Sequence, residues 1–125
     1  MGILDNSAVT GTFKGQLILW RGNRTTQIIE AHKGPVMAIH TRKKEFGIIT
    51  AGKDGMIIFW DGSMKQKQKI SLASYPDLCL NSLKITAICE NNEGTQFAVG
   101  TRGGDIVEFI GNKPKYIIII IRGNQ

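Results

Sequence analysis

The stretch that decides the fold is TAGKDGMIIFW, residues 50–60. Small residues lead into Asp54-Gly55, a preferred pair for the turn of a β-hairpin, where glycine supplies a positive φ. The β-branched and aromatic residues that follow are typical of a strand. Residues 50–60 therefore predict two antiparallel strands joined by a tight turn.

The same pattern occurs twice more in the chain. Residues 10–20 read TGTFKGQLILW and residues 99–109 read VGTRGGDIVEF, and both align with residues 50–60 without a gap. Each copy has a turn glycine, an apolar residue two positions later and an aromatic residue five positions later; the glycines are Gly15, Gly55 and Gly104. The aromatic residues are 40 and 49 positions apart. Repeats of this length built from short strands favour propeller blades over helical solenoids.

Composition and charge agree with an all-β domain. The chain has 125 residues, 42% of them hydrophobic, and Ile outnumbers Leu 19 to 7, which favours strands over helices. The net charge of +6 is divided equally on the two sides of Gly62 and predicts a weak general affinity for acidic surfaces. The sequence offers no secretory signal and no apolar run of the roughly 20 residues that cross a bilayer. We therefore expect a cytoplasmic protein that binds neither membranes nor a specific nucleic acid.

Residues 31–61 resemble one complete WD-repeat, which ends in Trp60-Asp61. In such repeats a His before the first strand, a Ser or Thr on the second, an Asp in the next turn and a Trp on the third form a hydrogen-bonded tetrad. The resemblance gives these roles to His32, Thr50, Asp54 and Trp60. A tetrad of this kind fastens strands together, so we interpret it as structural and not as a catalytic triad.

The first and third copies depart from the WD-repeat pattern. Lys14 in the first copy and Gly103 in the third stand where the second copy has Asp54. Phe109 in the third copy stands where the second copy has Trp60. We therefore expect no tetrad in either flanking copy. These degenerate copies and their loop motifs, over residues 7–124, are similar to the echinoderm microtubule-associated protein-like family, which carries tandem, partly atypical propellers.

The resemblance implies antiparallel four-stranded blades of a WD-repeat β-propeller in an incomplete ring. The expected blades span approximately residues 3–33, 34–82 and 83–125, and the first is expected to lack its innermost strand. Such an arc leaves terminal sheet faces and a strand edge exposed. We expect it to self-associate or to be part of a longer chain.

Other candidate sites have poor spacing. Cys79 and Cys89 are ten residues apart, and His32 and His40 are eight apart, whereas structural zinc sites favour Cys pairs two to four residues apart. Residues 100–104 lack the Lys-Ser/Thr ending of a phosphate loop. We expect no metal, no cofactor and no catalytic residue.

The remaining candidates are basic residues in predicted loops and outer strands. Contact with an acidic partner is one interpretation of them, and solvated loop charges are the other. The family resemblance suggests tubulin, with its acidic tails, as the partner. The predicted function is a non-enzymatic, microtubule-associated interaction scaffold at the cytoskeleton or cilium, and the alternative is a generic WD-repeat module without a cytoskeletal role. The candidate contacts are Arg42, Lys43, Lys44, Lys65, Lys67 and Lys69.

Overall fold

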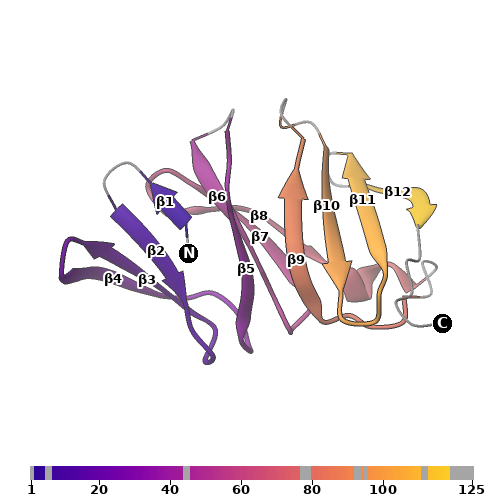
Figure 1. Ribbon diagram of the computed structural model, residues 1–125, viewed down its shortest axis with the longest axis horizontal. Helices are drawn as coiled ribbons and strands as arrows, with labels where there is room; N and C mark the ends of the chain where they lie inside the picture. The colour runs from indigo at the N-terminus through magenta and orange to yellow at the C-terminus, as the bar shows by residue number, and fades with distance from the viewer. Residues whose placement is uncertain are drawn as a thin grey trace.

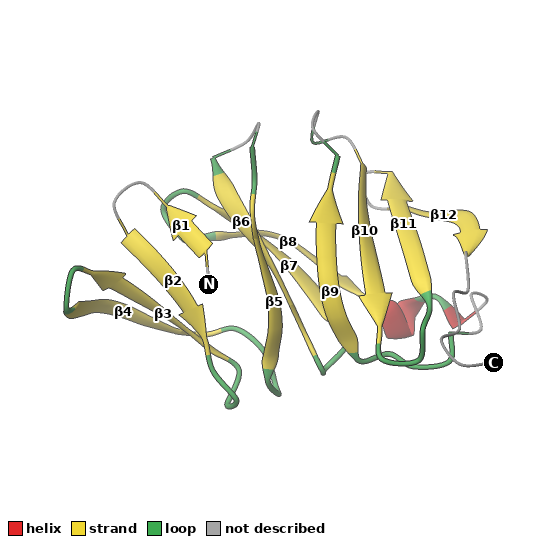
Figure 2. Ribbon diagram, in the orientation of Figure 1, coloured by secondary structure: helices red, strands yellow, loops and turns green. Residues whose placement is uncertain are grey.

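The chain folds into three four-stranded antiparallel sheets (Figure 1). The computed structural model describes residues 2–4, 7–43, 46–76, 80–91, 94, 96–110 and 113–118. These residues form strands and one short 3-10 helix (Figure 2), so the all-β, antiparallel fold predicted from the sequence is confirmed.

Each sheet is a meander in which strands that follow each other in the chain lie side by side. The first sheet consists of β1 (Gly2–Leu4), β2 (Ser7–Gly11), β3 (Gln16–Arg21) and β4 (Arg24–Glu30). The second consists of β5 (Val36–Thr41), β6 (Gly47–Gly52), β7 (Met56–Asp61) and β8 (Gln66–Ser71), and the 3-10 helix η1 (Leu72–Ser74) follows it. The third consists of β9 (Ile85–Glu90), β10 (Gln96–Thr101), β11 (Ile106–Ile110) and β12 (Lys113–Ile118).

The three sequence copies form equivalent hairpins, β2–β3, β6–β7 and β10–β11. Trp20 pairs with Ala8, Trp60 with Ile48 and Phe109 with Phe97. Each aromatic residue therefore has the same register, which confirms the hairpins predicted from the repeat.

Glycine is required at the turns of these hairpins. Gly15, Gly55 and Gly104 have φ angles of 89°, 77° and 86°, which residues with a Cβ rarely adopt. At Gly15 a Cβ atom would also collide with the carbonyl oxygen of His32, in the loop that leads to the next sheet. This glycine therefore allows one sheet to approach the next.

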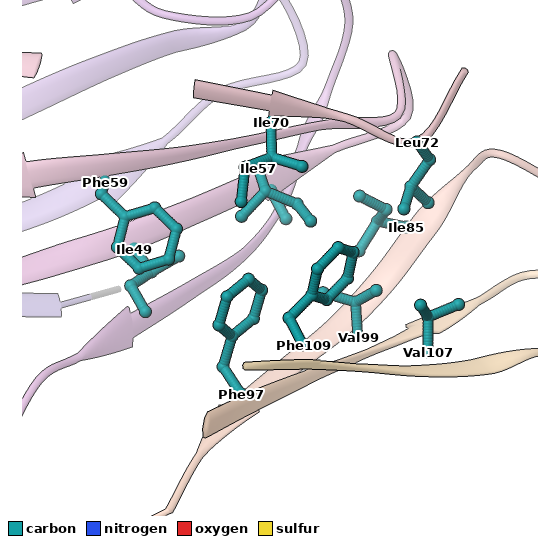
Figure 3. Close-up of a cluster of buried hydrophobic side chains, with 11 residues drawn as sticks. Ile49, Ile57, Phe59, Ile70, Leu72, Ile85, Phe97, Val99, Val107 and Phe109 are labelled. Carbon is teal, nitrogen blue, oxygen red and sulfur yellow. The ribbon is translucent and has the colours of Figure 1, made fainter. Parts of the chain in front are cut away.

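The sheets stack face to face, and the second sheet is buried on both sides. All six residues of β6 are buried, because alternate side chains enter two different cores. The core between the second and third sheets is drawn in Figure 3, where the rings of Phe97 and Phe109 stack at a centroid distance of 4.7 Å. Phe59 meets Phe97 edge to face at 5.2 Å. The core between the first and second sheets is formed by Val9, Leu17, Leu19, Ile48, Ile58, Trp60 and Met64.

The first sheet differs from its prediction. It was expected to lack the innermost strand, but β1 occupies that place and pairs with β2 through Gly2–Val9, Ile3–Ala8 and Leu4–Ser7. Three residues are enough for a short strand. The few residues before Ala8 therefore complete a four-stranded sheet.

The first and third sheets each have one face turned away from the second sheet. Ile28 of β4 is 56% exposed and Ile110 of β11 is 49% exposed on these outward faces. Glu108 also points outward, since its neighbours Val107 and Phe109 are fully buried in the core. The sheets of the described residues form an open row and no closed sheet.

Candidate functional site

The structure brings together four residues that the sequence analysis singles out. Trp60 on β7 donates its indole N–H to Thr50 Oγ1 on β6 at 3.0 Å. Thr50 Oγ1 lies 2.9 Å from His32 Nε2, in the loop between β4 and β5. His32 Nδ1 lies 3.1 Å from each carboxylate oxygen of Asp54, in the β6–β7 turn. These contacts make one hydrogen-bonded chain, which we call the His32 network.

Strand register explains how the hairpin positions two of these side chains. Thr50 pairs with Ile58 across the ladder, and Trp60 is two residues beyond Ile58 on the same strand. Side chains two residues apart on a strand share a face, so Thr50 and Trp60 point to the same side of the sheet. The indole therefore reaches the hydroxyl diagonally.

The hydrogen-bonding capacity of each group assigns the protons in the His32 network. Thr50 Oγ1 accepts from the indole N–H of Trp60 and can donate its own hydrogen to His32 Nε2. His32 then carries its single ring proton on Nδ1 and donates it to Asp54. Burial lowers the pKa of His32 below the ordinary 6.5, although Asp54 opposes this shift. Neutral His32 is therefore the form that fits its surroundings.

Asp54 also connects the network to the backbone. Its carboxylate accepts the backbone N–H of Lys33 at 3.0 Å and that of Met56 at 3.1 Å. A loop and a turn are thereby held by one side chain. The hydroxyl of Thr50 is fully buried and engaged by both neighbours, so the arrangement fastens strands and exposes no nucleophile.

The first sheet contains the equivalent of part of this network, and the third contains a different set of hydrogen bonds. In the first sheet Trp20 donates its indole N–H to Thr10 Oγ1 at 2.9 Å, which corresponds to the Trp60–Thr50 contact. In the third sheet Asp105 is 1% exposed and accepts the hydroxyl of Thr101 at 2.7 Å. The same carboxylate oxygen accepts the backbone N–H groups of Asn81 and Ser82 at 2.9 and 3.2 Å.

Sequence reasoning missed the role of Asp105. The alignment directed attention to Gly103, the equivalent of Asp54, whereas the functional carboxylate lies two residues later. The available signal was a Thr four residues before an Asp across a glycine-rich turn, a pattern that lets each side chain reach the other's backbone or hydroxyl.

Arg42 was predicted to contact an acidic partner, but its side chain is only 9% exposed. Its Nε and Nη2 atoms lie 2.8 and 2.7 Å from Glu90 Oε2, on β9 of the next sheet. His40 Nε2 lies 3.3 Å from Glu90 Oε1, and the guanidinium carbon of Arg42 lies 5.2 Å from the ring centroid of Phe59. The prediction for Arg42 is therefore corrected. Arg42 forms an ion pair between two sheets, and its partner Glu90 is 48 residues away in sequence.

The other predicted cations do not form one cluster. Lys43 is exposed after β5, and Lys44 lies outside the described residues. Lys65, Lys67 and Lys69 are exposed just before or along β8, an edge strand of the second sheet. Lysines on an outer strand also discourage pairing with other chains, so their position has a structural explanation as well as a functional one.

Asp61, the residue after Trp60, organises the β7–β8 turn. Its Oδ1 accepts the backbone N–H and the hydroxyl of Ser63 at 2.9 and 2.8 Å and the backbone N–H of Lys65 at 3.0 Å. The hydrogen bond from the Lys65 backbone is the main reason that the pKa of Asp61 is lowered, and Ser63 adds to it. The Trp-Asp pair thus combines a core residue with a turn residue.

A hollow of about 220 Å³ lies on the outward side of the third sheet and is lined in part by Cys89, Ala98 and Glu108. Cys89 is exposed, and Cys79 lies outside the described residues.

In the described part of the chain, no three His, Cys, Asp or Glu side chains gather as a possible metal site. The same residues contain no helix with the length and apolar character needed to span a membrane. No protein-family model matches the chain.

Proposed function

We propose that the chain is a non-enzymatic protein-interaction scaffold whose three sheets are successive blades of a WD-repeat-like propeller. The observation that carries this proposal is the His32 network, because its four members and their order match the tetrad that the resemblance implies. The equivalent register of the three hairpins also supports it. The exposed outward faces support the further proposal that additional sheets, from the same or another chain, pack there.

We further propose that the scaffold binds microtubules through the acidic surface of tubulin, in the cytoplasm at the cytoskeleton or cilium. Two features support this partner: the net charge of +6, and exposed lysines on the outer strand and loops of the second sheet. Positive side chains on a well-ordered scaffold attract acidic surfaces over a range set by salt. The similarity of the loop motifs to the echinoderm microtubule-associated protein-like family points to tubulin in particular.

Co-sedimentation with stabilised microtubules tests this function. We expect the protein to pellet with microtubules at about 0.1 M salt and to be released at about 1 M, where the Debye length falls from about 10 to about 3 Å. Removal of the acidic tubulin tails should weaken pelleting in the same way. A protein that stays in the supernatant at low salt contradicts the microtubule proposal and leaves the generic interaction module.

A further inference from the structure

Five connecting segments adjoin one another along one edge of the three sheets, the lower edge in Figure 1. Backbone hydrogen bonds hold them in order: Val36 to Thr12 at 3.0 Å, Lys53 to Pro35 at 3.1 Å and Arg102 to Lys84 at 2.8 Å. The turn at Gly55 in turn lies against the segment around Leu83. These segments are residues 12–15, 31–35, 52–55, 80–84 and 101–105.

Each segment contributes one basic side chain to this edge. All are exposed except Lys53, which is half-buried. None of the five forms an ion pair with a described residue. We call them together the basic edge: Lys14, Lys33, Lys53, Lys84 and Arg102.

The described carboxylates near the basic edge are used internally. Asp54 accepts from His32 and two backbone N–H groups, and buried Asp105 accepts from Thr101 and two backbone N–H groups. Glu30, exposed at the end of β4, accepts a hydrogen bond from Gln16 at 2.9 Å. Hydrogen bonds leave the negative charge of these three carboxylates in place, but the five cations outnumber them and four of the five are exposed. The net charge along this edge is therefore positive.

We propose that the basic edge binds an extended, acidic segment of a partner protein. Packed sheets are spaced about 10 Å apart, and an extended peptide advances about 3.3 Å per residue. A Glu-rich run of six to eight residues (about 20 to 26 Å when extended) can therefore present a carboxylate to each sheet. Phe13 and Leu83, 83% and 42% exposed, lie in the same segments and offer apolar contact to the partner's side-chain stems.

A polypeptide fits these observations better than a single-stranded nucleic acid does. Proteins that bind single strands stack successive bases on several aromatic side chains. Among the described residues of the five segments, Phe13 is the one exposed aromatic side chain. The inference rests on the proposed acidic-partner function and deepens it by moving the contact from the lysines of β8 to the basic edge.

Two variants with the same change in charge test the inference. The edge variant, Lys14→Glu/Lys53→Glu/Arg102→Glu, changes one cation on each sheet, and the control variant is Lys65→Glu/Lys67→Glu/Lys69→Glu. Binding of a labelled octa-glutamate peptide is measured by fluorescence anisotropy at about 0.1 M salt. We expect the edge variant to weaken binding about tenfold or more and the control about twofold or less. Unchanged circular dichroism and thermal midpoints check folding, and Lys14→Gln/Lys53→Gln/Arg102→Gln provides a milder second variant.

The outcomes separate the inference from the proposed function. Equal weakening by both variants means a diffuse charge effect and overturns the inference. Tighter binding of an oligouridine RNA, lost in the edge variant, overturns it in favour of a nucleic-acid site. If the edge variant pellets with microtubules as well as the wild type does, the inference fails while the microtubule function stands. If octa-glutamate binds the edge but the wild type does not pellet, the inference stands and the microtubule function fails.

Discussion

At the scale of single residues, the hydrogen bonds of the His32 network join buried polar side chains and hold two strands, a loop and a turn together. Unpaired buried polar groups cost free energy, but here donors and acceptors alternate from the indole of Trp60 to the carboxylate of Asp54. The network works with one tautomer of neutral His32, because Thr50 has one hydrogen to donate. A proton added to Nε2 would leave that hydrogen without its acceptor.

We predict that acidification destabilises the protein through His32. Burial holds the pKa of folded His32 below 6.5, whereas the unfolded chain takes up the proton near 6.5. The unfolded state therefore binds more protons in this window, so the free energy of unfolding is highest above pH 6.5 and falls as the pH drops toward the folded pKa. Chemical denaturation at about pH 7.5 and about pH 5.5 measures the effect.

Two variants isolate the contribution of His32. His32→Gln should be less stable at neutral pH and show a smaller loss between the two pH values. His40→Gln controls for the second histidine, which lies beside Glu90. A pH dependence as steep in His32→Gln as in the wild type would contradict the assignment.

The members of the His32 network could be predicted because the resemblance to a WD-repeat assigns a role to each of the four residues. Asp105 could not be predicted in the same way, since it serves its sheet from a position two residues away from the aligned one. Arg42 was misinterpreted for a different reason: its sequence neighbours, Lys43 and Lys44, suggest a solvated loop, but the fold places Glu90 beside it.

At the scale of elements, the β2–β3 turn determines how closely the first sheet approaches the loop that leads to the second. Gly15 combines a positive φ with a backbone contact to His32, whereas Gly22 has a φ of 64° and no heavy atom within 4 Å of an added Cβ. A side chain at Gly22 therefore introduces backbone strain alone, whereas a side chain at Gly15 introduces backbone strain and a steric collision.

We predict that Gly15→Ala destabilises the protein more than Gly22→Ala does. The left-handed conformation alone costs about 1–2 kcal/mol for alanine, and forced repacking at Gly15 adds about 1–3 kcal/mol. Denaturant unfolding of both variants measures the difference, with Gly34→Ala, which also meets nothing within 4 Å, as a near-neutral reference. Equal effects at Gly15 and Gly22 would mean that the sheets can separate at this turn without loss.

The hairpins could be predicted from sequence because glycine and aromatic landmarks specify their turns and ends. The strand β1 was missed, since three residues are too few to show an alternating pattern. The 3-10 helix η1 was also missed, because a single turn leaves no helical periodicity to detect.

At the scale of the whole molecule, the Arg42–Glu90 pair connects the second and third sheets beside their shared apolar core. The Glu90 side chain is 3% exposed, so the pair is almost fully removed from water. Removal of one partner from such a pair leaves a charge without compensation, whereas replacement of both is often tolerated.

We predict that Arg42→Met and Glu90→Gln each destabilise the protein by about 3–5 kcal/mol, with less than additive effects in the double variant. Denaturant unfolding measures the double-mutant cycle, and amide hydrogen exchange locates the change. Exchange should increase in β9 and β10 more than in β2 and β3, which lie in the first sheet. Additive effects would show that the two charges act independently.

The contact between sheets could be predicted only in outline. Buried faces follow from the apolar strands, but the identity of cross-sheet partners depends on residues separated by dozens of positions, as Arg42 and Glu90 are. No local pattern encodes such a pair. The basic edge was missed for the same reason, since its five members are scattered between residues 14 and 102.

Glu108 limits what can pack against the outward face of the third sheet. In the hairpin alignment its position corresponds to Phe59 and Leu19, which are core residues of the other two sheets. A purely apolar surface packed on this face would remove water from a carboxylate, and removing a charged group from water costs free energy. A sheet that packs at this end of the molecule therefore has to accommodate a charged side chain at the position where the other two sheets present an apolar core residue.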